Sequence, residues 1–331
     1  MSKVIPSLYE TYKDYFAIGA AVNTPALSTH KELLKKHFNS ITAENEMKPI
    51  SLNPEKGKYT FEEADAMIEF AGTHNKLVRG HTLVWHNQTS DHVFTDENGD
   101  YVSPDTLIAR LREYMSIVFD HFGDKVYCWD VLNEAIEDKQ NKFYRDTKWL
   151  EILGEDYIDM IFSLARDLNS DTLLFYNDYN AVIPEKRDKI YKLLKGMKEK
   201  SIPLDGVGIQ GHWNIHDFNF DDIKRAIEKY ASLDLKIHIT ELDISMFSSK
   251  DKRTDVKEPT AEMIEKQNDF YENIFSIFRE YHKVIGNVTL WGIADDYTWL
   301  DYFPVKDRKN WPLLFDENHS PKEAFWRVVE F

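Results

Sequence analysis

Two glutamates follow buried apolar runs, each at the point where the run ends. The run Val126–Leu132 is followed by Asn133 and Glu134, and the run Lys236–Thr240 is followed by Glu241. Two carboxyl groups that face one another across about 5–5.5 Å can cleave a glycosidic bond with retention, because one protonates the leaving oxygen and the other attacks the anomeric carbon. A lone glutamate in such a place could instead cap a helix or pair with Lys or Arg. Because such a glutamate follows two of the runs, we interpret Glu134 and Glu241 as a catalytic pair.

A histidine is spaced to support the second carboxylate. Residues two apart in a strand share a face, so Glu241 and Asp243 point the same way, as do Gln210 and His212. We predict that His212 holds Glu241 while Asp243 fixes the tautomer of the ring. The alternative is a core histidine that bonds only to the backbone.

Aromatic residues accompany the same strand ends. Burial among rings such as Trp85, Trp129 and Trp291 raises the pKa of a carboxylic acid, as a proton donor at neutral pH requires. Rings at strand ends can also stack on sugar faces. The candidates for stacking are Trp85, Trp291, Trp299, Tyr176 and Tyr297. Trp291 and Trp299 are favoured because they flank a polar turn, 294–296, that a buried helix would not tolerate.

Short β-rich runs alternate with longer segments of helical periodicity, which is the pattern of βα units. The eight predicted strands are 17–22, 40–46, 77–85, 126–134, 172–178, 206–213, 236–243 and 287–294. Their number and the length of 331 residues predict a (β/α)8 TIM barrel, in which functional side chains gather at the carboxyl ends of the strands. An open doubly wound sheet is the alternative, but no GxGxxG turn follows the first strand.

Amphipathic helices are predicted between the strands, most clearly over 185–200. Two further helix starts are predicted at Ser103-Pro104 and Ser320-Pro321, where an N-cap residue precedes a proline at the first helical position. The charged stretch 250–258 is predicted to be a long loop.

Composition limits the classes of partner. Lys and Arg number 41 against 57 Asp and Glu, a formal charge of -16, which opposes binding to nucleic acid or to anionic lipid. No run is long and apolar enough to span a membrane, and the first residues lack the apolar run of a secretory leader, so we expect a cytoplasmic protein. The single cysteine, Cys128, excludes an internal disulfide.

The chain shows no internal repeat and no linker rich in Gly, Ser or Pro. We therefore expect one catalytic domain over residues 1–331, without a carbohydrate-binding module. The helix faces are amphipathic, but none indicates an interface, so the sequence predicts no particular oligomeric state.

Six segments closely resemble, in order, segments of the family 10 glycoside hydrolases, the endo-β-xylanases. They are 41–48 (ITAENEMK), 79–86 (RGHTLVWH), 129–134 (WDVLNE), 177–180 (NDYN), 208–212 (GIQGH) and 239–243 (ITELD). The resemblance spans nearly the whole chain. It implies a (β/α)8 barrel that cleaves β-1,4-linked xylose chains internally and with net retention, and we expect no metal and no cofactor.

The resemblance also implies roles for individual residues. Glu134 is expected to be the acid/base and Glu241 the nucleophile, which Gln210 and His212 would order. The residues expected to bind sugar on the non-reducing side of the cut are Glu44, Asn45, Lys48, His81 and Trp85.

Four more sugar contacts are implied. Asn133 is expected to contact the 2-hydroxyl of the cleaved sugar, Trp291 and Trp299 to roof the cleft, and Tyr176 to lie on the leaving-group side. Many family members are secreted and carry binding modules, whereas neither is expected here. Imported xylo-oligosaccharides are therefore the expected substrate in preference to polymeric xylan, with the preferred chain length left open.

Three other functions fit parts of the pattern. A metal-dependent barrel hydrolase is suggested by histidines near strand ends, namely His81, His86, His212 and His238, although no HxH or HExxH spacing is present. A barrel that binds sugar without cutting it is opposed by the presence of both acids. A retaining glycosidase for another β-1,4-glycan, such as cellulose, would differ in steric fit at Glu44, Asn45 and Lys48.

Overall fold

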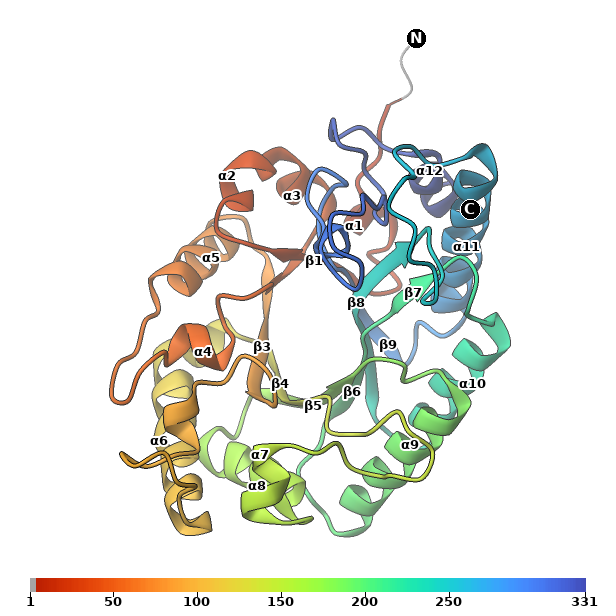
Figure 1. Ribbon diagram of the computed structural model, residues 1–331. Coiled ribbons are helices and arrows are strands. Elements are labelled where there is room, and N and C mark those ends of the chain that lie inside the picture. The colour runs from red at the N-terminus through yellow and green to blue at the C-terminus, as the bar shows by residue number, and fades with distance from the viewer. Residues whose placement is uncertain (1–3) are drawn as a thin grey trace.

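The strands of the computed structural model, which describes residues 4–331, close into a barrel (Figure 1). Their order around the ring is β6-β5-β4-β3-β2-β1-β9-β8, and β6 pairs with β8 to complete it. All of these pairings are parallel. The strands are β1 (Ala17–Val22), β2 (Ser40–Ala43), β3 (Leu77–Trp85), β4 (Cys128–Asn133), β5 (Leu173–Asp178), β6 (Gly206–Ile209), β8 (Lys236–Ser245) and β9 (Ile285–Leu290).

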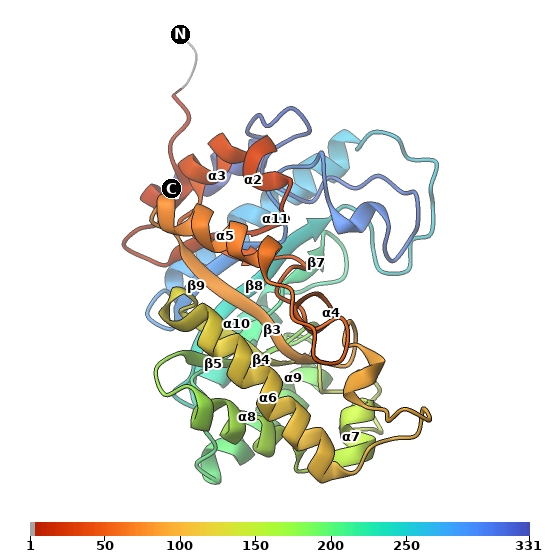
Figure 2. The ribbon, with the colours of Figure 1, turned by 90° about the vertical axis from the view of Figure 1, so that its left-hand side faces the viewer.

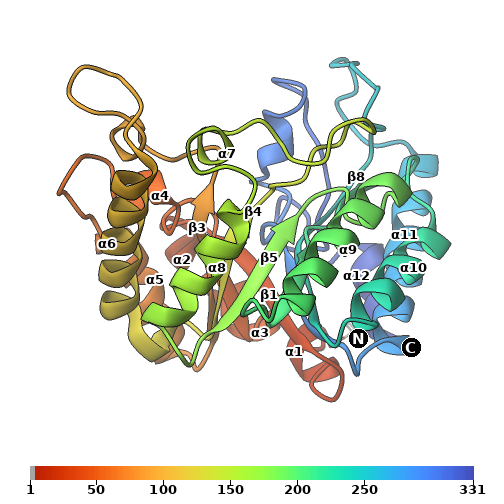
Figure 3. The ribbon, with the colours of Figure 1, turned by 90° about the horizontal axis from the view of Figure 1, so that it is seen from below.

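Helices follow each barrel strand and cover the outside of the ring (Figure 2). They are α1 (Leu8–Thr11), α2 (Ala26–Thr29), α3 (Lys31–His37), α4 (Pro49–Leu52), α5 (Glu62–Thr73), α6 (Pro104–Phe122), α7 (Lys148–Leu153), α8 (Tyr157–Leu168), α9 (Pro184–Glu199), α10 (Phe220–Ala231), α11 (Ala261–Glu280) and α12 (Glu323–Val329). Long loops extend beyond the carboxyl ends of the strands (Figure 3). The predicted (β/α)8 barrel is confirmed. None of the helices within residues 4–331 is long and apolar enough to cross a membrane.

Three predicted strands differ from the structure beside the cleft. The eighth was predicted over 287–294, but β9 ends at Leu290, and Trp291 lies beyond the strand. The second was predicted to reach residue 46, but β2 ends at Ala43, and Glu44 and Asn45 leave the sheet and line the cleft described below. The sixth, predicted over 206–213, is interrupted because Gly211 has a φ of +82°, outside the region of a strand. The chain resumes as β7 (His212–Asn214), a short strand that pairs with β8.

The predicted helices are mostly confirmed. Ser103 caps α6 by accepting a hydrogen bond from the backbone N–H of Thr106, and 250–258 is a loop. The helix start predicted at Ser320-Pro321 is wrong. Pro321 instead forms an isolated bridge with Phe315, because the carboxylate of Asp316 accepts from the N–H of Ser320 and holds a turn there.

The barrel interior contains a charged pair beneath the cleft. Arg79 on β3 is 1% exposed, its Nε donates to Oδ2 of Asp130 on β4 at 3.1 Å, and its Nη1 lies 2.7 Å from Nδ1 of His238 on β8. Breaking such a buried pair by removing one partner typically costs about 3–5 kcal/mol. The Arg79–Asp130 pair, together with His238, therefore links three strands inside the barrel beneath the cleft.

Close approach of β3 and β4 gives a testable expectation. Gly80 pairs with Trp129, and a Cβ at position 80 would lie 2.3 Å from the indole ring. Gly80→Ala should therefore destabilise the protein by about 1–3 kcal/mol through overpacking, measured as a lower Tm. Gly196→Ala in α9, where an added Cβ meets nothing within 4 Å, is the matched control and should leave Tm unchanged or raise it. Equal effects of the two substitutions would contradict this packing.

Candidate active site

A cleft of about 590 Å³ opens at the carboxyl ends of the barrel strands. Its walls come from β3, β4, β8 and the segments after β2, β5, β6 and β9, so the closed ring brings together residues far apart in sequence. Of the residues predicted for the site, the cleft is lined by Glu44, Asn45, Lys48, His81, Trp85, Asn133, Glu134, Gln210, His212, Glu241, Trp291 and Trp299.

Glu241 lies on the wall formed by β8 and is only 5% exposed. His212 Nε2 lies 3.0 Å from Oε2 of Glu241, and Nδ2 of Asn177 donates to Oε1 at 2.7 Å. Burial alone would raise the pKa of Glu241, but the hydrogen bond from His212 and the charge of nearby His81, followed by the bond from Asn177, lower it to about 2. Glu241 is therefore an ionised carboxylate with both oxygens held in place.

His212 joins this carboxylate to a second one. Its Nδ1 lies 2.9 Å from Oδ2 of Asp243, and that same oxygen accepts a hydrogen bond from Nε1 of Trp299 at 2.8 Å. Burial disfavours the charged ring, but Asp243 and Glu241 outweigh it and raise the pKa of His212 to about 10. The predicted Glu241–His212–Asp243 arrangement is thus present, with the ring as a cation that donates to both carboxylates.

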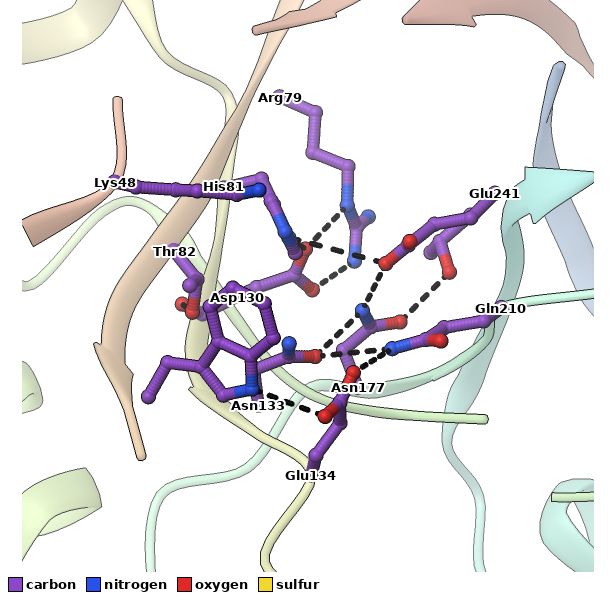
Figure 4. Close-up of polar contacts among 12 residues, drawn as sticks. Lys48, Arg79, His81, Thr82, Asp130, Asn133, Glu134, Asn177, Gln210 and Glu241 are labelled. Carbon is purple, nitrogen blue, oxygen red and sulfur yellow. Dashed lines mark hydrogen bonds and ion pairs between the residues drawn. The ribbon is translucent and has the colours of Figure 1, made fainter. Parts of the chain in front are cut away.

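Glu134 begins the segment after β4 in a left-handed backbone conformation, with a φ of +60°. Nε1 of Trp85 donates to its Oε2 and Nε2 of Gln210 donates to its Oε1, each at 3.0 Å (Figure 4). Both of these donors are neutral, whereas His212 brings a positive charge to Glu241. The cleft thus contains two carboxyl groups in different surroundings, which is the arrangement that separates an acid from a nucleophile.

Asn177, near the end of β5, contacts both glutamates, Glu241 at its carboxylate and Glu134 at its backbone. Besides donating to Glu241, its Nδ2 donates to Oδ1 of Asn133 at 3.0 Å, and its backbone carbonyl accepts from the N–H of Glu134 at 2.9 Å. Its own Oδ1 accepts from the hydroxyl of Thr240. Asn177 belongs to the segment 177–180, but no role was predicted for it from the sequence. Its position as a polar residue directly after the apolar run 173–176 was the signal that could have identified it.

Two further groups shape the opposite wall. Lys48 donates to Oδ1 of Asn45 at 3.0 Å and to Oε1 of Gln88 at 2.9 Å, and its Nζ lies 5.0 Å from the ring centre of Trp85. Burial lowers the pKa of Lys48, although the surrounding carboxylates, Glu241 first among them, oppose that shift. The hydroxyl of Tyr297 donates to Glu44 at 3.3 Å.

The structure corrects two expected contacts. Tyr176 is 0% exposed and donates its hydroxyl to Asp178 at 2.5 Å, so it faces the helices and cannot touch a sugar. Strand alternation is the reason, because its neighbour Asn177 takes the inward position. Tyr179 lines the cleft instead.

The side chain of Gln210 was expected to order the nucleophile but bonds to Glu134. Only its backbone carbonyl contacts β8, by accepting from the N–H of Glu241 at 2.7 Å. The interruption at Gly211 separates Gln210 from His212, so the two side chains serve different carboxyl groups.

The histidines that suggested a metal-dependent hydrolase do not converge. His238 lies inside the barrel, stacked on Phe175 with 4.3 Å between ring centres and bonded to Arg79. His81 binds Oδ2 of Asp130 through Nδ1 at 2.9 Å. Beyond the predicted residues, the cleft is also lined by His86, Asn87, Gln88, Arg145, Tyr179, Asn180 and Phe303.

Comparison with known proteins agrees with this geometry. The model of glycosyl hydrolase family 10 matches residues 7–331. The chain is similar to endo-1,4-beta-xylanase B of Paenibacillus barcinonensis, with 51% identity over 99% of each chain. It superimposes on the crystal structure of an endo-1,4-beta-xylanase from Caldicellulosiruptor owensensis with a TM-score of 0.97, at 54% identity over 99% of this chain and 100% of the other.

A further solved structure, 51% identical, with a TM-score of 0.96 and covering 98% of this chain and 99% of the other, is of a mutant in complex with xylotriose. The match to the family model extends over nearly all of the chain that carries the barrel and the cleft. This chain belongs to glycosyl hydrolase family 10.

Proposed function

We propose that this chain is a retaining endo-1,4-β-xylanase that cleaves xylo-oligosaccharides by double displacement. The observation that carries the proposal is the pair of carboxyl groups in one cleft, Glu134 between neutral donors and Glu241 ionised beside a cationic His212. Family membership and the xylotriose bound by a solved relative support xylose chains as the substrate.

In the first step, Glu134 gives its proton to the glycosidic oxygen while a carboxylate oxygen of Glu241 bonds to the anomeric carbon. The bond from that carbon to the leaving oxygen breaks, and a covalent glycosyl-enzyme forms. In the second step, Glu134 removes a proton from water, which attacks the same carbon and releases Glu241. Two inversions restore the original β configuration.

The hydrogen bonds around Glu241 serve both steps. They fix the orientation of the carboxylate before the attack, so that little of the barrier is spent on aligning it. When Glu241 loses its charge in the intermediate, the cation on His212 loses one of its two partners, which favours return of the carboxylate in the second step. Asp243 keeps its hydrogen bond to the ring of His212 in both steps.

Cytoplasmic location is part of the proposal. Fractionation of the native host should recover the protein with a cytoplasmic marker. Recovery from the culture medium would overturn the location without affecting the proposed reaction.

Removing the nucleophile should separate its role from that of its neighbours. Glu241→Ala should lower kcat on xylohexaose by at least about 10⁴-fold, because the covalent intermediate cannot form. Added azide should restore turnover of an activated aryl xyloside and give the α-configured product. Glu97→Ala, at an exposed loop position, is the control and should retain wild-type kcat. A loss without azide rescue would argue against Glu241 as nucleophile.

Removing the acid should depend on the leaving group. Glu134→Ala should cost about 10²–10⁴-fold on xylohexaose, whose leaving oxygen needs a proton, and far less in the first step with a dinitrophenyl xyloside, whose leaving group does not. Pre-steady-state release of dinitrophenol measures that step alone. Equal losses on both substrates would remove Glu134 from the acid role.

Substrate class and mode of cleavage can be tested together. The wild-type protein should release products of several lengths from xylohexaose at early times, as an endo-acting enzyme does, and should act far less on cellohexaose, whose hydroxymethyl groups must fit beside Glu44 and Lys48. Product chromatography over time gives both results. Comparable rates on the two hexasaccharides would overturn the xylose preference.

A further inference from the structure

Three potential metal ligands meet outside the catalytic cleft. His30 lies between α2 and α3, Asp296 follows β9, and His319 lies in the turn before α12. Their ligand atoms all lie within 4.8 Å of one another, and this is the one group of three such side chains that meets this criterion among residues 4–331. None of the three lines the cleft. Neither His30 nor His319 lies in a segment for which the sequence predicted a function.

Both histidines present the same nitrogen to one carboxylate. Nε2 of His30 lies 2.9 Å from Oδ1 of Asp296, and Nε2 of His319 lies 3.4 Å from Oδ2. The two imidazole rings are 4.3 Å apart between centres. His30 is only 7% exposed, whereas Asp296 and His319 are each about one third exposed. One ligand is thus fixed, and the other two are open to an ion from solvent.

A hydroxyl group holds the second ring nitrogen of His30. Its Nδ1 lies 2.8 Å from the hydroxyl of Thr29, and that hydroxyl donates its single proton to the carbonyl of Pro25 at 3.2 Å. The hydroxyl oxygen can then accept from Nδ1–H, which leaves a lone pair on Nε2 pointing at a carboxylate oxygen. In this tautomer Nε2 can bind a metal ion shared with Asp296, whereas in the other tautomer Nε2–H donates a hydrogen bond to Asp296. A hydrogen bond that fixes the other ring nitrogen in this way is typical of metal-binding histidines.

We propose that His30, Asp296 and His319 bind a divalent transition-metal ion of the zinc class. Two imidazole nitrogens and one carboxylate oxygen suit such an ion, with ligand distances of about 2.0–2.2 Å and water at the open position. Donors up to 4.8 Å apart must move closer to reach one ion. His319 can supply that movement because its side chain is partly exposed and lies on a turn.

The ion would restrain the loop that carries the roof of the cleft. The loop after β9 lies beside α2 and α3 (Figures 1 and 2). Next to Asp296, Tyr297 donates to Glu44, and Trp299 donates to Asp243. An ion at Asp296 therefore ties this loop to α2, α3 and the C-terminal turn, beside a pocket that shares Glu44, Trp291 and Trp299 with the cleft. Its role is structural, and the catalytic steps above do not use it.

The test is a titration of chelator-treated, desalted protein with zinc chloride, followed by calorimetry and by thermal unfolding. The wild-type protein should bind one ion, and Tm should rise by about 4 °C when free zinc is about a hundredfold above Kd. His319→Asn should weaken binding at least about tenfold and reduce the rise in Tm at the same zinc concentration to about half or less. Asparagine is chosen because residue 319 has a φ of +62°, a conformation that asparagine tolerates.

A matched control distinguishes a chelate from an ordinary pair. His121 and Asp65 lie 2.7 Å apart with similar exposure, but no second histidine joins them. His121→Ala should retain the wild-type affinity and the wild-type rise in Tm. Asp296→Asn provides a second test and should behave like His319→Asn. Absence of stoichiometric binding to the wild type, or equal binding to His319→Asn, would overturn the proposal.

Discussion

The cleft depends on keeping the carboxylate of Glu241 ionised although it is almost completely buried. Moving a lone charge out of water costs several kcal/mol, and a carboxyl group in an apolar site would take up a proton instead. The hydrogen bonds from His212 and Asn177, with the charge of His81 nearby, oppose this and lower its pKa to about 2. In the proposed mechanism, Glu241 therefore needs no deprotonation before it attacks.

Each of those partners comes from a different strand, so the lowered pKa of Glu241 depends on the closed barrel. Asn177 lies near the end of β5, His81 lies on β3, and His212 begins β7 after the interruption at Gly211. The Arg79–Asp130 pair below binds His81 through Asp130. Above, Trp299 donates to Asp243, which connects the roof of the cleft to the same set of hydrogen bonds. The lowered pKa of Glu241, the closed barrel and the shape of the cleft therefore depend on one connected set of hydrogen bonds.

The barrel, both glutamates and the His212–Asp243 support could be predicted from local pattern, because a strand's period of two and the position of its carboxyl end are properties of short segments. The directions in which the side chains of Gln210 and Tyr176 point could not be predicted in this way. The direction of Gln210 depends on the glycine conformation at residue 211. The direction of Tyr176 depends on which face of β5 turns inward once the ring closes. The role of Asn177 was missed for a similar reason, since Glu134 and Glu241 lie 43 and 64 residues away and meet it only in the barrel.

The most direct test of this account is the titration of Glu241 itself. In protein carrying glutamate labelled with ¹³C at the side-chain carboxyl, the signal that disappears in Glu241→Gln identifies the residue. The account predicts that this signal keeps the chemical shift of an ionised carboxylate from about pH 7 down to about pH 4. A titration midpoint at or above the ordinary value of 4.5 would contradict it.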